Sequence, residues 1–347
     1  MSVAVVILNY NGKELLEELL PKVIAYSPEA EVIVVDNASS DDSVLYLETK
    51  FPNTRLIKLP HNFGFAGGYN EALSIVKADY YVLLNSDVEV TENWLLPLVT
   101  YMDKHPRTAA CQPKIKSYKQ RTHFEYAGAC GGYIDTLGYP FCRGRILDTL
   151  EQDNGQYNTI TDIFWATGAC LFIRSEKYHK TGGLDDRFFA HMEEIDLCWR
   201  LKARGNNIVC IPQSTVYHIG AKTLAKESPQ KTYLNFRNNW LMLYKNVPKH
   251  IGGILFARLL LDWAAAIHLL IEGKFKNAMA IIRAEISFIR KYHQFHYDRK
   301  NNLHLTKISA PKGMFKGMIL WSYYVKKEQM AQDLIWKQGI NSIKVQK

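Results

Sequence analysis

The chain has 347 residues, 47% of them hydrophobic, which is enough for one large domain with an appendage or for two domains. Its formal net charge of +9 at pH 7 favours an anionic partner, namely nucleotide phosphates, a membrane surface or a nucleic acid. Six scattered cysteines without a Cys-x-x-Cys pair argue against a zinc knuckle and against a disulfide framework.

Apolar runs of strand length alternate with helical patterns in the amino-terminal part of the chain. Strands are predicted at residues 3–8, 31–35, 55–59 and 80–84, and helices at 12–25, 41–51 and 67–76. This alternation predicts βαβ units, and therefore an α/β fold with a mostly parallel sheet flanked by helices. In such sheets, ligands bind at the carboxyl ends of the strands.

The residues just beyond these strand ends are small, polar or glycine, as expected for a binding site. The second strand ends at Asp36, a position at which dinucleotide-binding folds hold a ribose. That interpretation requires Gly-x-Gly-x-x-Gly after the first strand, where this chain has Asn-Tyr-Asn-Gly. The hydride-transfer interpretation is therefore weak, and Asp36 could equally bind a pyrimidine edge or the ribose of a mononucleotide. The structural alternative is a helix cap, or a turn closed with Ser39.

Two further residues are candidates for binding a metal ion. Asp87 follows the most apolar strand, and a carboxylate there could hold a divalent cation that bridges two phosphate oxygens. A simple turn residue is the alternative. His218 closes a later strand just before Gly220, which suits a metal or phosphate contact. A structural histidine is the alternative there.

An acidic segment begins a predicted helix in the middle of the chain. Residues three and four apart share a helix face, so Glu193 lines up with Asp196 and Arg200, which can pair with each other. Glu194 instead leads an apolar face beside two like charges. That setting should raise its pKa, as a general base near neutral pH requires. The alternative is a solvated helix start favoured by the helix dipole.

The last third of the chain is aromatic, basic and helical. Residues 251–271 are long enough to span a membrane, but Arg258, Asp262 and His268 make a crossing unfavourable. Residues 276–292 form a basic amphipathic pattern that could lie in an anionic membrane interface. The alternative is a helix that packs on the domain with a solvated basic face.

Together, these motifs resemble the inverting family 2 glycosyltransferases with the GT-A fold, especially the rhamnosyltransferase-like branch. The matching stretches fall within residues 1–220, in the family's order. They are Val-Val-Ile-Leu-Asn-Tyr-Asn at 5–11, Val-Val-Asp-Asn-Ala-Ser-Ser-Asp at 34–41, Asn-Phe-Gly-Phe-Ala-Gly-Gly-Tyr-Asn at 62–70, Leu-Asn-Ser-Asp-Val at 84–88, Gly-Ala-Cys at 168–170, the segment 183–200 and Tyr-His at 217–218.

The resemblance implies roles for individual residues. Asp36 would contact the nucleotide base, Asp87 would be the metal-binding aspartate of a DxD-type motif, and Glu194 would be the catalytic base. In all, it implies a nucleotide-sugar site of Asn9, Tyr10, Asn11, Asp36, Asn62, Gly64, Gly68, Asn70 and Asn85, a metal site of Asp87 and His218, and a catalytic group of Glu194, Glu193 and Asp196. Two departures matter: Glu replaces the family's Asp at the base, and Asn85-Ser86-Asp87 keeps one of two DxD carboxylates.

The resemblance also implies an organisation, partners and a location. Residues 1–107 would bind the nucleotide sugar, 108–230 would form the acceptor and catalytic half, and 231–347 would be a helical region in contact with a membrane. The expected reaction moves a sugar from a nucleoside diphosphate-sugar donor to a hydroxyl of a glycan or lipid-linked glycan, with inversion and with Mg²⁺ or Mn²⁺. Such an enzyme would serve cell-surface polysaccharide or glycolipid synthesis from the cytoplasmic face of the membrane, held there peripherally and without a nucleic-acid partner.

Two other function classes remain open at the level of the sequence. One is a non-catalytic module that binds a nucleotide sugar or a glycan, in which the acidic helix is only structural. The other is a nicotinamide oxidoreductase, which the missing glycine fingerprint weakens.

Overall fold

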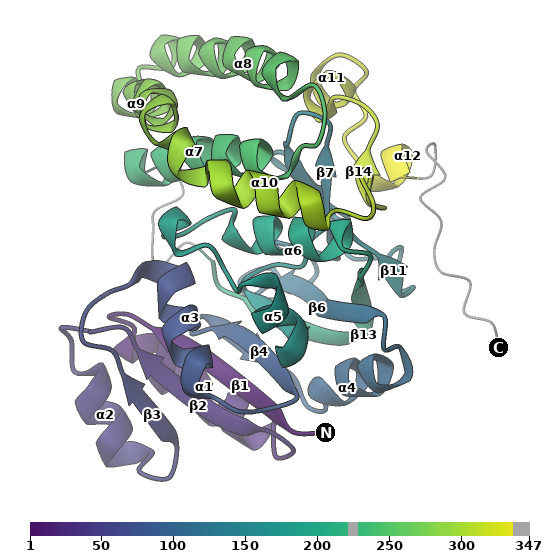
Figure 1. The fold of residues 1–347 in the computed structure, drawn as a ribbon. Coiled ribbons are helices and arrows are strands. Elements are labelled where there is room, and N and C mark those ends of the chain that lie inside the picture. Colours follow the sequence, from purple (N-terminus) through teal and green to yellow (C-terminus); the bar gives the residue numbers. More distant parts are fainter. Residues whose placement is uncertain (221–227, 336–347) are drawn as a thin grey trace.

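The computed structural model describes residues 1–220 and 228–335 and contains two sheets covered by helices (Figure 1). The larger sheet has nine strands in the order β11-β13-β6-β12-β4-β1-β2-β3, with β5 paired to β13. Its strands are β1 Val3–Asn9, β2 Glu31–Asp36, β3 Arg55–Lys58, β4 Tyr80–Asn85, β5 Val88–Val90, β6 Thr108–Ser117, β11 Thr161–Asp162, β12 Cys170–Arg174 and β13 Asn207–His218. The α/β class is confirmed.

Strands β3, β2, β1 and β4 are parallel, as predicted, and their register brings the predicted strand ends together. Asn9 lies opposite Asp36, and Leu8 lies beside Asn85. The sheet changes direction at β12, which is antiparallel to both β4 and β6. The whole sheet is therefore mixed, and its parallel character is concentrated in the amino-terminal half.

Helices cover both faces of the larger sheet, which explains why its central strands are apolar throughout. Val5 and Ile7 belong to a core shared with α1 and α4, whereas Ala4 and Val6 belong to a core shared with α3 and α6. The helices of this part are α1 Lys13–Ala25, α2 Ser43–Lys50, α3 Gly64–Ile75, α4 Leu95–Lys104, α5 Ser175–Thr181 and α6 Glu193–Ala203.

A smaller sheet joins the middle of the chain to its carboxy-terminal part. Its order is β10-β9-β8-β7-β14, and β14 pairs in parallel with β7. The strands are β7 Gly132–Asp135, β8 Pro140–Cys142, β9 Arg145–Ile146, β10 Thr149–Leu150 and β14 Met314–Phe315. The carboxy-terminal region thus adds a strand to the middle region, while the proposed boundaries at 107 and 230 stay predictions.

The predicted helical extension is present. It comprises α7 Pro229–Asn246, α8 Ile251–Ile271, α9 Phe275–Lys291, α10 His296–Leu305, α11 Ile319–Tyr324 and α12 Ala331–Ile335. Helices α7 and α10 lie next to α6, and α8 and α9 lie farther from the large sheet (Figure 1). Within the described ranges, α8 is the one helix long and apolar enough to cross a membrane, with a mean hydropathy of 1.9.

Arg258 and Asp262 of α8 face the protein, whereas His268 near the end of the helix is exposed. Arg258 and Asp262 are buried and form an ion pair at 3.1 Å, as their spacing predicts. Trp240 of α7 donates to the second Asp262 oxygen at 2.7 Å. The Arg258 guanidinium lies 3.8 Å from the centre of the Tyr139 ring. These contacts fix α8 to the domain through its polar side and leave an apolar side exposed.

Candidate active site

The ends of β1 and β2 form a buried polar cluster. Asn9 donates to Asp36 Oδ1 at 3.2 Å and to Ser39 Oγ at 3.2 Å, and the Ser39 amide donates to Asp36 Oδ2 at 2.9 Å. The turn between Asp36 and Ser39 therefore exists. The buried Asn9 Oδ1 has no hydrogen-bond partner, and a Cβ on Gly12 would lie 2.5 Å from it. An acceptor oxygen is thus left free for a ligand at this edge.

Tyr10 and Asn11 line the same edge from the loop after β1. The Tyr10 side chain is 43% exposed, so its ring is accessible to a planar base. Asn11 has a positive φ of 50° and accepts a hydrogen bond from the Ser40 amide at 2.7 Å. It ties the loops after β1 and β2 together, which gives Asn11 a structural role beside its predicted binding role.

The segment before α3 is held by Asn37, which the sequence argument did not single out. Asn37 donates to Asn62 Oδ1 and to the Gly64 carbonyl oxygen, both at 3.0 Å. Gly64 has a φ of +72°, and a Cβ there would lie 2.5 Å from the Phe189 ring. A Cβ on Gly68 would lie 2.8 Å from Leu8. Close packing therefore explains why a side chain would not fit at either position. The contact of these two glycines with the nucleotide stays a prediction.

Asn70 lies in a different setting from the predicted one. Its Nδ2 donates to the Leu184 carbonyl at 2.8 Å, and its Oδ1 accepts from the Leu184 amide at 3.1 Å and from Tyr178 Oη at 2.6 Å. These bonds occupy the amide group and fix the loop before α6. Asn70 is thus a structural residue of that loop, and we revise its assignment to the nucleotide site.

Asp87 and His218 meet at the edge formed by β4, β5 and β13. His218 Nε2 lies 3.1 Å from Asp87 Oδ1, and its Nδ1 lies 3.2 Å from Glu125 Oε2. Burial opposes ionisation of His218 and of Asp87. The two carboxylates nevertheless raise the pKa of His218 to about 10. The charge and hydrogen bond of His218 in turn lower the pKa of Asp87.

The same pair of side chains suits a divalent cation. A carboxylate and an imidazole within 3.1 Å of each other can share a cation in place of a proton. In residues 1–220 and 228–335, no group of three His, Cys, Asp or Glu side chains is arranged to enclose a metal ion. Of the described residues, Asp87 and His218 could thus supply two ligands, and diphosphate oxygens and water would complete the shell, as is usual for Mg²⁺.

Glu194 lies next to this edge. A Cβ on Gly168 would lie 3.9 Å from Glu194 Cδ, and the adjacent Ala169 carbonyl accepts from the Asn85 amide at 3.0 Å. Residues 168 and 169 therefore contact both the end of β4, which Asp87 follows, and Glu194 at the start of α6. Sequence reasoning predicted these elements separately, and the antiparallel pairing of β12 with β4 brings them together.

The two glutamates at the start of α6 differ in exposure. Glu193 is 3% exposed, and burial together with the negative charges of Glu194 and Asp196 raises its pKa well above the usual range. Glu194 is only partly buried, and desolvation raises its pKa to about 7 although backbone hydrogen bonds, one of them from Gly168, oppose the shift. One oxygen of each glutamate is buried without a partner. Glu194 is therefore the glutamate able to exchange a proton near neutral pH.

Asp196 lies in a buried ion-pair cluster. Its Oδ2 accepts from Arg200 Nε and from Lys245 Nζ, both at 2.9 Å, and its Oδ1 accepts from Asn246 at 2.7 Å. These donors outweigh the effect of burial and lower its pKa. The predicted pair with Arg200 is confirmed. A fully bonded, wholly buried carboxylate is unsuited to proton transfer, so we revise the predicted catalytic role of Asp196 to a structural one.

The segment 188–192, here called the strap, leads into Glu193 and has unusual backbone geometry. Phe189, His191 and Met192 all have a positive φ, between 66° and 71°. Such conformations persist only where the surroundings fix them, and they are frequent at active sites. Asn238 of α7 donates to the carbonyl oxygens of residues 188, 190 and 191, at 3.0, 2.8 and 2.7 Å.

Several residues of the site were thus missed by the sequence argument. They are Asn37 at the nucleotide edge, Glu125 beside His218, and Arg237, Asn238 and Lys245 on α7. For the residues of α7, the available signal was a polar helix face rich in Asn, Arg and Lys. The partners of these side chains could not be predicted from the sequence, because each partner lies far away in the chain.

A comparison with protein families matches residues 4–176 to the model described as "Glycosyl transferase family 2". Among curated proteins, the O-antigen biosynthesis protein RfbC of Myxococcus xanthus is 28% identical over 229 residues, which cover 63% of this chain and 17% of RfbC. The N-acetylglucosaminyl-diphospho-decaprenol L-rhamnosyltransferase of Mycobacterium tuberculosis (strain H37Rv) is 24% identical over 255 residues, which cover 69% of this chain and 83% of that protein.

Solved structures of glycosyltransferases share the fold. TarS residues 1–349 of S. aureus, in complex with UDP-GlcNAc, superpose with a TM-score of 0.56 at 18% identity, covering 88% of this chain and 89% of that one. GalNAc-T7 with UDP, GalNAc and Mn²⁺ gives a TM-score of 0.56 at 17% identity, covering 73% and 49%. These similarities show the GT-A fold, and neighbours with this fold have been crystallised with Mn²⁺.

Proposed function

Because this chain belongs to glycosyltransferase family 2, we propose that it moves a sugar from a nucleoside diphosphate donor to an acceptor hydroxyl, with inversion. The observation that carries the mechanism is the position of Glu194. This partly exposed carboxylate has a pKa of about 7 and lies beside the strand end that leads to Asp87. Membership of the family sets aside the nicotinamide oxidoreductase alternative.

The proposed reaction has one displacement. The acceptor hydroxyl oxygen attacks the anomeric carbon, and Glu194 takes its proton as the bond forms. The bond from the anomeric carbon to the diphosphate oxygen breaks, and the nucleoside diphosphate leaves with the bonding electrons from the opposite face. Attack and departure on opposite faces invert the anomeric centre. A divalent cation bound by Asp87 and His218 would neutralise charge on the leaving diphosphate.

The donor would bind along the edge built by β1, β2 and β4. Asn9 offers its free Oδ1, Asp36 is fixed beside it, and the exposed Tyr10 ring can stack on a base. Asn85 ends β4 next to Asp87. We retain these residues as the nucleotide-sugar site, with Asn11, Asn62, Gly64 and Gly68 shaping its loops.

For the acceptor, we propose a lipid-linked glycan of cell-surface polysaccharide synthesis. The mycobacterial relative is named for an acceptor in which a sugar is joined through a diphosphate to a polyprenol. The exposed apolar side of α8 and the basic face of α9 support an acceptor held at a membrane. Both helices pack on α7, which also holds the strap, and α8 contacts Tyr139 as well.

The same surface supports peripheral attachment to the cytoplasmic face of a membrane. Large apolar side chains are exposed along α8 and α9: Phe256, Leu260, Trp263, Ile267, Met279, Ile282, Ile286 and Ile289. Because Arg258 and Asp262 bind α8 to the domain, the helix is suited to lie on a bilayer rather than cross it. Co-sedimentation with anionic vesicles should weaken as salt rises, whereas a spanning helix would resist both salt and alkaline extraction.

The proposed function is tested by donor turnover. A panel of nucleoside diphosphate-sugars, with and without Mn²⁺ or Mg²⁺, should reveal a donor that raises the melting temperature and is transferred or slowly hydrolysed. Asp87→Ala should abolish that turnover, and Lys300→Ala, on an exposed face of α10, serves as the matched control. A donor that stabilises the protein but is never turned over would instead support the non-catalytic binding module.

A further inference from the structure

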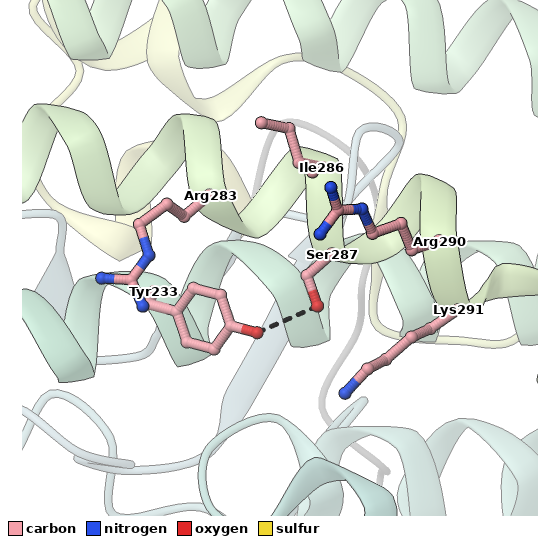
Figure 2. Close-up of a pocket in the computed structure, with 6 residues that line it drawn as sticks. All are labelled: Tyr233, Arg283, Ile286, Ser287, Arg290 and Lys291. Atoms are coloured by element: carbon pink, nitrogen blue, oxygen red, sulfur yellow. Dashed lines mark hydrogen bonds between the residues drawn. The ribbon is translucent and has the colours of Figure 1, made fainter.

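A basic pocket lies between α7 and α9, outside the site described above. It has a volume of about 370 Å³ and is lined by Tyr233, Arg283, Ile286, Ser287, Arg290 and Lys291. Figure 2 shows the three charged groups placed around the hydrogen bond from Tyr233 Oη to Ser287 Oγ, which is 2.9 Å long. The pocket therefore combines three cations with two hydroxyl groups.

No carboxylate within the described part of the chain forms an ion pair with Arg283, Arg290 or Lys291. The Arg283 guanidinium instead lies 5.8 Å from the centre of the Tyr233 ring. Burial would raise the pKa of Tyr233, but the Ser287 hydrogen bond and the charges of Arg237 and Lys291 outweigh it and lower that pKa. Among the residues that the structure describes, the pocket thus carries three positive charges that no carboxylate pairs with, and planar guanidinium groups suit phosphate oxygens.

The pocket opens beside an apolar stripe. Met279, Ile282, Ile286 and Ile289 follow one another at intervals of three or four residues along α9, and all four are exposed. Ile286 belongs both to this stripe and to the pocket wall. A ligand that joins phosphate to a hydrocarbon chain would satisfy both features, because its charged part would meet the cations and its chain would follow the stripe.

The pocket is also connected to the strap. Tyr233 and Arg237 are one helical turn apart on α7, and the Arg237 guanidinium lies 5.4 Å from the centre of the Tyr233 ring. Arg237 donates to the carbonyl oxygen of Phe188 at 2.9 Å, at the start of the strap. A phosphate bound in the pocket would therefore sit one turn of α7 from the segment that leads into Glu193 and Glu194.

We propose that this pocket binds the diphosphate of the lipid-linked acceptor. The inference rests on the proposed function, because it is the transfer reaction that makes the bound molecule an acceptor. Two arginines and a lysine attract a negatively charged diphosphate, whereas a neutral glycan would leave their charges without a partner. Held there, the diphosphate directs the sugar attached to it along α7 towards Glu194.

The test measures binding of farnesyl diphosphate to the full chain by calorimetry, without a divalent cation. In Arg283→Gln/Arg290→Gln, the dissociation constant should rise about tenfold or more, since 1.4 kcal/mol corresponds to a factor of ten. Lys300→Gln/Lys307→Gln removes the same charge from exposed positions outside the pocket and should leave the dissociation constant unchanged. Asp87→Ala should also leave the dissociation constant unchanged, because the donor edge is a separate site.

Three results would overturn the proposal. The first is equal binding by the pocket variant and the wild type, and the second is loss of binding in Asp87→Ala, which would place the diphosphate at the donor edge. The third is that the pocket variant loses binding to phosphatidylglycerol vesicles while farnesyl diphosphate binds normally, which would assign the pocket to bulk lipid headgroups.

Transfer kinetics separate this inference from the proposed function. With a short-chain diphosphate-linked sugar acceptor, the pocket variant should raise the acceptor KM about tenfold and leave donor hydrolysis in water unchanged. A wild-type protein that binds farnesyl diphosphate through the pocket but never turns over a donor would refute the proposed function alone. Normal transfer with an unchanged acceptor KM in the pocket variant would refute the pocket alone.

Discussion

The side-chain amide of Asn238 donates to the backbone carbonyl oxygen of His191 at 2.7 Å, across 47 positions of sequence. His191 has a positive φ of 70° and stands two residues before Glu193. A helix of the carboxy-terminal region thereby fixes the backbone that leads into Glu193 and the proposed base Glu194. Helix α7 and the start of α6 are mechanically joined at this bond.

Replacing Asn238 with Leu should slow catalysis more than it weakens donor binding. The strap would lose its donor to the carbonyls of residues 188, 190 and 191, and small shifts of a catalytic group cost up to about 10²-fold in rate. We expect kcat to fall roughly 10- to 100-fold with the donor KM unchanged. Asn239→Leu is the control, because Asn239 is equally buried but donates to the Gly138 carbonyl. Equal loss of kcat in both variants would mean that general destabilisation is the cause.

Glu194→Gln should lower kcat by about 10²–10⁴-fold, the usual contribution of general acid–base catalysis. Glutamine keeps the shape of the side chain but cannot accept the acceptor's proton. Steady-state transfer at saturating donor and acceptor measures the effect. Glu193→Gln is the comparison, because burial raises the pKa of Glu193 well above its usual range and leaves its side chain less accessible than that of Glu194. Normal turnover by Glu194→Gln would exclude this residue as the base.

The rate should rise with pH through about 7. The base must be ionised to accept a proton, and burial raises the pKa of Glu194 to about 7, so the active fraction grows from pH 6 to pH 8. His191, nearby on the strap, has its pKa lowered to about 4 by burial and by Lys231, so it stays neutral in this range. A profile of kcat against pH tests this, and a midpoint that does not move in Glu194→Asp would argue against the assignment.

Lys245→Met should destabilise the protein by about 3 kcal/mol, the lower end for breaking a buried ion pair. Lys245 Nζ contacts Asp185 at 2.6 Å and Asp196 at 2.9 Å, and all three side chains are buried. Urea unfolding at pH 7 measures the loss, with the exposed Lys307→Met as a control. A change below about 1 kcal/mol would show that Arg187 and Arg200 suffice for the two aspartates.

The same cluster predicts how stability depends on acid. Despite burial, the cationic partners of Asp185 and Asp196 lower the pKa of both in the folded state. Their contribution to stability is therefore present above the unfolded pKa of about 4 and is lost as pH falls below it. Lys245→Met weakens this preference for the ionised form, so the difference in stability between the variant and the wild type should shrink from pH 7 to pH 3.

The first four strands, the helices between them and the polar residues at the strand ends could be predicted from the sequence. Apolar runs that alternate with helical patterns predicted β1 to β4 and the helices between them. A strand of a parallel sheet is buried on both faces, so it appears in the sequence as a continuous apolar run. The carboxyl ends of parallel strands share one edge, so Asn9, Asp36 and Asn85 could be placed together without coordinates. Helical spacing likewise separated Glu194 from the paired Asp196 and Arg200.

Tertiary structure alone decided which of these polar residues are free. The sequence treats Asn70 and Asn9 alike, yet Leu184 and Tyr178 occupy the Asn70 amide, whereas Asn9 keeps an unbonded oxygen. Helical spacing predicted the pair of Asp196 with Arg200, but only the folded structure adds Lys245 of α7, which completes the ion-pair cluster around Asp196. A side chain's neighbours in sequence fix its helix face or strand end, but its hydrogen-bond partners come from distant segments that only the packed chain brings into contact.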